Sequence, residues 1–171
     1  LHIRIMGIVS DGKVTVPGGD DIMNYGDEVY FAVETAHLTR AMASFGHEEK
    51  EARRIVIVGG GNVGLFLAQA LEEDHPNVSP KMIEMSKERA QDVAEQLDRT
   101  VVLHGDALDR EILEEANVQS ADTVVAVAND DEVNILASLL AKRAGCRRAI
   151  TLINNATYGP LITSLGIDVV V

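Results

Sequence analysis

The chain has 171 residues, 46% of them hydrophobic, and a formal net charge of −12. An acidic excess of this size repels nucleic acid phosphates and anionic lipid headgroups, so neither nucleic acid nor an anionic membrane surface is expected as a partner. The apolar runs are shorter than the roughly 20 residues that a membrane span needs, so we also expect no direct membrane insertion.

The start of the chain and its cysteine content indicate the protein's context. No basic segment leads from Leu1 into an apolar stretch, so we expect no signal peptide and interpret the sequence as a piece of a longer protein. The single cysteine, Cys146, fits a reducing compartment. Its neighbours Arg147 and Arg148 would lower the pKa of its thiol.

Residues 1–45 predict a small β-rich unit. Apolar runs flank Asp11-Gly12, a dipeptide typical of a two-residue hairpin turn. A helix should follow the strands, because Leu38, Met42 and Phe45 share one helical face. The expected elements are strands around residues 3–9, 13–16 and 28–33, and a helix over residues 37–45.

The composition changes after this unit. Residues 46–52 hold no core-forming side chain and predict a solvated connector. From residue 53 to 171, six apolar runs alternate with helical patterns, which predicts a Rossmann-like, doubly wound parallel sheet. The fold class is therefore α/β, preceded by part of a small α+β subdomain. The six strands are expected at residues 55–58, 81–85, 101–103, 123–128, 149–153 and 167–171.

A glycine motif follows the first strand of the predicted sheet. Gly59, Gly61 and Gly64 have the GxGxxG spacing of dinucleotide-binding turns and precede a helical pattern that runs to Glu73. The first glycine permits the tight turn, the second lets the backbone approach a pyrophosphate, and the third lets the helix lie close to the sheet. The helix N-terminus would direct its free N–H groups at phosphates. The alternative is a glycine-rich turn that binds nothing.

The second strand should end at an acidic residue that accepts hydrogen bonds from the adenosine ribose. Glu84, about 20 residues beyond the motif, is in that position, and the alternative is an ordinary exposed acid at a strand end. A carboxylate there repels a 2′-phosphate, which favours NAD or an adenosine nucleotide over NADP. The nearby Lys87 and Arg89 are expected to face solvent.

Polar residues also follow the third and fourth strands. Asp106 and the backbone of Ala107 are expected on the adenosine side, although Asp106 could equally cap the next helix. Asp130 and Asp131 are interpreted mainly as caps of a helix N-terminus, with contact to the far half of the nucleotide or to a cation as the alternative.

Residue patterns typical of a catalyst are missing from the sequence. There is no Tyr-x-x-x-Lys pair, GxSxG nucleophile, Walker lysine or zinc-ligand spacing. Hydride transfer also needs a proton donor or acceptor and a substrate-orienting cation, and neither is evident. We therefore expect no enzyme, no catalytic residue and no metal site. The histidines are scattered and are expected at surfaces or turns: His2, His37, His47, His75 and His104.

With these motifs in place, the sequence resembles the regulators of potassium conductance, known as RCK or KTN domains. The resemblance lies in IVIVGGGNVGLFLAQALE, the acid in MIEMS, HGDALDREILEEA, ADTVVAVANDDEVNILASLLAKRAG and YGPLITSLGIDVVV. Residues 1–45 resemble the C-terminal part of the small subdomain, RCK-C, that ends such a unit. The chain would then join the end of the first unit of a tandem to the NAD-binding Rossmann domain, RCK-N, of the second, over residues 53–171.

The resemblance implies a cytoplasmic, peripheral regulatory subunit on the inner face of the cell membrane. Such a subunit forms a homo-oligomer, a dimer or a tetrameric ring, and gates potassium uptake through a TrkH-type potassium channel subunit. The implied ligand is NAD or NADH, with ATP or ADP as alternatives. The expected cofactor-binding residues are Gly59, Gly61, Asn62, Val63, Gly64, Glu84, Asp106, Ala107 and Ala128.

The sequence differs from the family pattern at two positions, and two other functions compete with this interpretation. Asn154 follows the fifth strand where many relatives have arginine, and Pro80 must lie at the start or edge of a strand because it lacks an N–H group. One competing hypothesis is a fragment of an NAD-dependent oxidoreductase whose catalytic domain lies elsewhere. The other is a structural RCK unit that binds no ligand.

Overall fold

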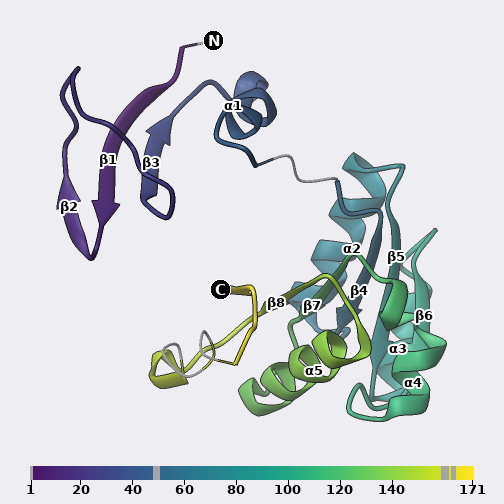
Figure 1. Cartoon of the computed structure of the whole chain (residues 1–171). Coiled ribbons are helices and arrows are strands. Elements are labelled where there is room, and N and C mark those ends of the chain that lie inside the picture. The colour runs from purple at the N-terminus through teal and green to yellow at the C-terminus, as the bar shows by residue number, and fades with distance from the viewer. Residues whose placement is uncertain (1, 48–50, 159–161, 163–164) are drawn as a thin grey trace. The chain divides into compact units, whose positions relative to one another are not determined.

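The computed structural model describes residues 2–47, 51–158, 162 and 165–171. The chain forms two compact units, Leu1–Lys50 and Glu51–Val171 (Figure 1). Each unit has its own sheet.

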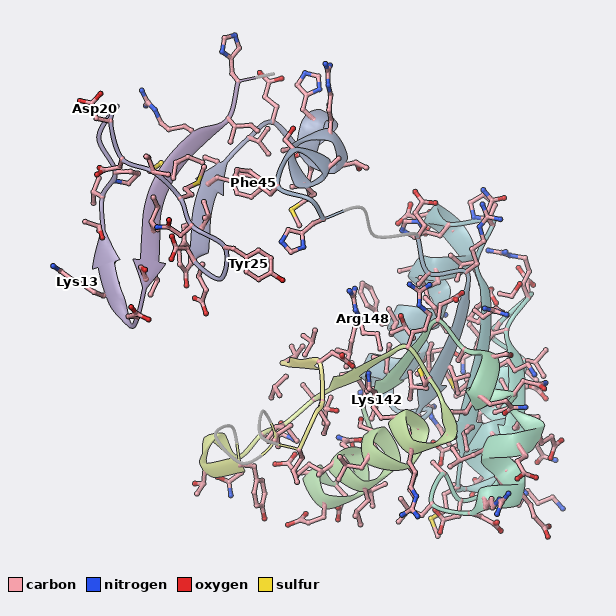
Figure 2. The ribbon with its side chains drawn as sticks, in the orientation of Figure 1. Lys13, Asp20, Tyr25, Phe45, Lys142 and Arg148 are labelled. Carbon is pink, nitrogen blue, oxygen red and sulfur yellow. The ribbon has the colours of Figure 1, made fainter. Side chains whose placement is uncertain are left out.

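The first unit is a three-stranded antiparallel sheet followed by a short helix. Strands β1 (Arg4–Ser10), β2 (Lys13–Thr15) and β3 (Glu28–Ala32) lie in the order β2-β1-β3. Asp11 and Gly12 form the turn with φ values of 51° and 74°, which confirms the predicted hairpin. The one-turn helix η1 (Thr35–His37) leads into α1 (Leu38–Ser44). The ring of Phe45, which is labelled in Figure 2, follows α1. It stacks on the ring of Phe31 in β3, with centroids 5.1 Å apart.

The second unit is a six-stranded parallel sheet with helices between its strands (Figure 1). The strand order is β6-β5-β4-β7-β8-β9. Successive strands are added toward one edge from β4 to β6 and toward the other edge from β7 to β9, which confirms the predicted doubly wound α/β class. The strands are β4 (Arg54–Val58), β5 (Ser79–Glu84), β6 (Val101–His104), β7 (Thr123–Ala126), β8 (Arg148–Thr151) and β9 (Val169–Val170). The helices are α2 (Asn62–Asp74), α3 (Lys87–Ala94), α4 (Arg110–Glu115) and α5 (Asp131–Ala144), with one-turn helices η2 (Val118–Ser120) and η3 (Ala156–Tyr158).

Alternate residues of the central strand β4 enter opposite faces of the sheet. Val56 packs in a cluster with Leu113 of α4 and Ala137 of α5, whereas Ile57 packs in a second cluster with Ala68 of α2. Burial of each such aliphatic side chain contributes about 1.5–3 kcal/mol. Because both faces are covered by helices, the carboxyl ends of the strands form the edge of the sheet at which a ligand can bind.

The structure bears on the position of Pro80 and on the length of the helices. Pro80 is the second residue of β5, paired with Ile55 of β4, so it lies at the start of the strand as its missing N–H requires. None of the helices in the described ranges combines the length and apolar character needed to cross a bilayer.

Candidate functional site

The carboxyl ends of five strands surround one pocket in the second unit. This strand-end pocket has a volume of about 860 Å³ and is lined by residues that end or follow β4, β5, β6, β7 and β8. Of the nine residues expected to bind a cofactor, eight line it: Gly59, Gly61, Asn62, Val63, Glu84, Asp106, Ala107 and Ala128. Residues far apart in the sequence therefore meet at one site, and only Gly64 is outside its lining.

The loop after β4, residues 59–61, is held against its neighbours by close backbone contacts. Gly59 has φ of 104°, a conformation that other residues rarely adopt, and its N–H donates to the carbonyl of Ile83 at 2.9 Å. A Cβ at Gly59 would lie 2.8 Å from the backbone nitrogen of Ala128. This glycine loop therefore fits between β5 and the end of β7 only because position 59 has no side chain.

Gly64 lies beneath the loop, in the first turn of α2. A side chain there would overlap the carbonyl oxygen of Gly59, so the glycine lets α2 begin directly against the loop. This geometry matches the packing role expected for the third glycine of the motif. It explains why Gly64 is absent from the pocket wall.

The N-terminus of α2 has no side-chain cap. Its N-cap residue is Gly61, and no side chain among the described residues bonds to the first N–H groups of the helix, although Asn62 and Val63 line the strand-end pocket. Helices α3, α4 and α5 are capped by Ser86, Asp109 and Asp130, respectively. Uncapped N–H groups and the positive end of the helix dipole make the start of α2 a site for an anionic group.

Glu84 joins the end of β5 to the glycine loop. Its carboxylate accepts hydrogen bonds from the N–H of Gly60 at 2.6 Å and of Ser86 at 2.8 Å. A Cβ at Gly60 would lie 3.1–3.3 Å from Glu84 side-chain atoms, so position 60 also favours glycine. Glu84 is half-buried and lines the pocket, unlike an ordinary exposed acid at a strand end.

Arg89 differs from its sequence-based prediction. It does not face solvent: its side chain is half-buried, lines the strand-end pocket and donates from Nε to the carbonyl of Gly60 at 2.7 Å. Lys87, two residues earlier, is exposed as expected and is not part of the lining. Position 89 lies in the first turn of α3, and the direction of its side chain depends on how α3 packs against the sheet, which buries Ala90 and Val93.

Asp106 closes the turn after β6 rather than capping α4. Its carboxylate accepts from the N–H of Leu108 at 2.9 Å, and the cap of α4 is Asp109, which accepts from Glu111 at 2.9 Å. The capping alternative for Asp106 is therefore wrong. Ala107 is buried at 6% exposure and forms part of the pocket wall.

Asp130 and Asp131, considered together in the sequence, have different roles. Asp130 caps α5 by accepting from the N–H of Val133 at 2.9 Å, and it lines the pocket. Asp131 instead accepts from the backbone N–H groups of Asn154 and Asn155, at 3.0 and 2.9 Å, and from the Asn154 side chain at 3.0 Å. The backbone bond from Asn154 and these further bonds lower the pKa of Asp131, against the opposing effect of burial. Asp131 thus fixes the loop after β8, in which Asn154 reaches the pocket.

Asn134 is a positioning residue that the sequence did not reveal. It is fully buried in α5 and bonds to both backbone groups of Ala128, accepting from N–H at 2.7 Å and donating to the carbonyl at 2.8 Å. Its amide also donates to the carbonyl of Leu152 at 3.0 Å. One side chain therefore holds the ends of β7 and β8 together behind the pocket. The available signal was a polar residue one helical turn after the Asp130 cap, on the sheet-facing side.

The charged residues of the pocket wall are three acids and one base: Glu84, Asp106, Asp130 and Arg89. The part of this lining that the structure describes contains no histidine, cysteine, lysine or tyrosine. No cluster of side chains suited to a metal ion occurs in the described part of the chain. Cys146 lies elsewhere, and burial raises the pKa of its thiol, contrary to the lowering expected from Arg147 and Arg148.

Comparison with known proteins relates this geometry to a family. The model of the TrkA-N domain family matches residues 55–171. Over 168 residues the chain is 46% identical to the Trk system potassium uptake protein TrkA of Azorhizobium caulinodans, an alignment that covers 98% of the chain and 37% of that relative. The chain therefore spans little more than a third of the relative's length.

Two crystal structures have a similar fold. The GsuK RCK domain has a TM-score of 0.67 at 24% identity, over 99% of this chain and 35% of that one. The GsuK channel bound to NAD has a TM-score of 0.66 at 23% identity, over 99% of this chain and 29% of that one. At such identities the similarity supports the fold alone.

Proposed function

The chain belongs to the TrkA-N domain family, and we propose that its second unit binds NAD or NADH as the sensing part of a regulator of potassium uptake. Two comparisons support this proposal. The relative from Azorhizobium is named as a potassium uptake protein, and the GsuK channel, of similar fold, has a structure with NAD bound.

The observation that carries the proposal is the uncapped N-terminus of α2 at a pocket that also holds Glu84. The N–H groups around Gly61, Asn62 and Val63 would receive the pyrophosphate, since they have no side-chain acceptor. Glu84 would accept the hydroxyls of the adenosine ribose, with Asp106 and Ala107 on the adenosine side and Ala128 toward the second half of the dinucleotide.

The charges of the strand-end pocket favour a dinucleotide or ADP over ATP. Three carboxylates and one guanidinium line it, so each additional phosphate charge meets net repulsion. A pyrophosphate bridging two nucleosides carries less negative charge than a triphosphate. We therefore rank NAD and NADH first and ADP second.

A sensing role agrees with the composition of the pocket wall. Hydride transfer to a substrate requires a group that donates or accepts a proton. Among the described residues that line the pocket there is no histidine, lysine or tyrosine, and of its three carboxylates Glu84 would bind the ribose and Asp130 caps α5. Binding would instead shift the protein between two arrangements, which takes a coupling free energy of about 1–3 kcal/mol.

The assembly around this unit is part of the same proposal. Residues 1–45 would be the C-terminal part of an RCK-C subdomain, residues 46–52 its connector, and residues 53–171 the RCK-N domain. The full-length protein would form a ring on the cytoplasmic face of the membrane and contact a TrkH-type channel subunit. Support comes from the similarity to TrkA over 98% of the chain.

The test uses the full-length protein with its membrane subunit in vesicles. We expect NADH to change the rate of potassium uptake, and Gly61→Ala to remove that response while uptake itself persists. No oxidation of NADH should accompany the change. Nucleotide-dependent oxidation of a substrate would favour the oxidoreductase alternative. A rate of potassium uptake that is the same with and without nucleotide would overturn the regulatory proposal.

A further inference from the structure

Among the described residues that line the strand-end pocket, Arg89 is the one with a basic side chain. The proposed function uses the glycine loop, the start of α2 and Glu84, and leaves this guanidinium without a role. A half-buried cation in a wall with three acids calls for a physical explanation.

The hydrogen bonds of Arg89 leave most of its donors available. Nε donates to the carbonyl of Gly60 at 2.7 Å, which holds the Nε side of the guanidinium at the glycine loop. An arginine side chain has five N–H donors, so four remain. Among the described residues, no carboxylate forms an ion pair with Arg89. Its charge is therefore available to a ligand in the pocket.

Glu84 and Arg89 act on the same residue. The N–H of Gly60 donates to Glu84, and the carbonyl of Gly60 accepts from Arg89. Both side chains therefore contact the backbone of Gly60, and both line the strand-end pocket. A ribose whose hydroxyls reached Glu84 would lie at the part of the pocket wall that Arg89 also forms.

We propose that Arg89 is a second determinant of nucleotide selectivity, which binds the 2′-phosphate of NADPH and limits the discrimination that Glu84 imposes. Guanidinium groups bind phosphate through paired charge-assisted hydrogen bonds, whereas a carboxylate repels it. The charge of Glu84 is already partly compensated by two N–H donors, which weakens that repulsion. The inference rests on the proposed function, because it presumes that the adenosine ribose reaches Glu84.

The experiment measures dissociation constants of NADH and NADPH by calorimetry for the unmodified protein and five variants. Arg89→Gln also removes the contact with Gly60, which should lower the affinities for NADH and NADPH equally. The ratio of the two dissociation constants therefore reports the contribution of the 2′-phosphate alone. We expect this variant to lose about tenfold more affinity for NADPH than for NADH. Glu84→Gln should raise the affinity for NADPH relative to that for NADH by about tenfold. The double variant with Glu84→Gln and Arg89→Gln should not show this relative increase.

Lys87→Gln is the matched control, because it removes an equal charge from the same helical turn at an exposed position outside the pocket. Its ratio should equal that of the unmodified protein. Arg89→Lys retains the charge and should keep part of the NADPH affinity, which separates a local effect from misfolding. Equal losses for both nucleotides in Arg89→Gln would overturn the selectivity role. Absence of NADH binding in the unmodified protein would instead refute the proposed function.

Discussion

The carboxylate of Glu84 and the backbone N–H of Gly60 form a hydrogen bond of 2.6 Å, which makes the end of β5 and the glycine loop one structural unit. Glu84 therefore positions the loop in addition to its proposed contact with the ribose. A simple truncation of Glu84 removes both effects together, so mutations must be chosen to separate them.

Gly60→Ala tests the positioning effect without changing a charge. The new Cβ would lie 3.1 Å from a Glu84 carboxylate oxygen, so the loop or the acid must shift by a few tenths of an ångström. We expect about a tenfold loss of NADH affinity, since small misplacements of a binding group are costly. Calorimetry gives the affinity. Gly19→Ala, where the added atom meets nothing within 4 Å, is the control, and equal affinities of the two variants would contradict the role of the loop.

Alanine substitutions at Gly64 and Gly61 distinguish the effect of helix packing on stability from the effect of the glycine loop on NADH binding. Alanine at Gly64 would overlap the backbone of Gly59, and we expect it to destabilise the protein by about 1–3 kcal/mol. Alanine at Gly61 has its nearest neighbour at 3.8 Å, so stability should be retained while the approach of the pyrophosphate is obstructed. Urea unfolding and NADH titration of both variants provide the comparison. The account fails here if Gly64→Ala unfolds like the unmodified protein.

Asn134→Ala should weaken the frame behind the pocket. The truncation leaves partly buried backbone groups of Ala128 and Leu152 without their partner, at a cost of up to about 1–3 kcal/mol for each unsatisfied group. We expect a clear fall in the free energy of unfolding, measured in urea. Gln91→Ala, an exposed position in α3, serves as the control and should change stability by less than about 0.5 kcal/mol. Similar stabilities of the two variants would show that Asn134 does not hold these strands.

Acid should destabilise the protein partly through Glu72. Desolvation raises its pKa, but hydrogen bonds from Asp98, Arg99 and Thr100 prevail and lower it from 4.5 to about 2. Because the folded-state pKa is depressed, the stabilisation is present above about pH 4.5 and is lost as pH falls toward 2. The unfolding temperature of Glu72→Gln should therefore fall less steeply over this range than that of the unmodified protein. Parallel curves would refute the assignment.

Much of the fold and part of the site follow from local sequence signals. The glycine spacing after an apolar strand and the acid at the end of the next strand are short-range patterns. They placed Gly59, Gly61 and Glu84 at the sheet edge where the structure has them. The cap formed by Asp130 was also predicted, since it depends only on residues within one helical turn.

The residues that sequence reasoning missed depend on packing between distant elements. Arg89 reaches the pocket because of the rotation of α3 against the sheet, which buries Ala90 and Val93. Asp131 bonds to residues 23 and 24 positions later, whose location requires the sheet order. Asn134 looked like any polar helical residue until the ends of β7 and β8 were placed beside it. None of these relationships is encoded by local spacing.

The central claim is that the adenosine ribose of a bound nucleotide donates to Glu84 in the strand-end pocket. The most direct measurement compares the affinities of ADP and 2′,3′-dideoxy-ADP for the protein and for Glu84→Gln. In the unmodified protein, loss of the hydroxyls should weaken binding about tenfold or more, as expected for hydrogen bonds to a charged group. In Glu84→Gln, both nucleotides should bind more weakly and the difference between them should shrink to about threefold or less. An undiminished difference in the variant, or no binding of ADP to the unmodified protein, would contradict the account.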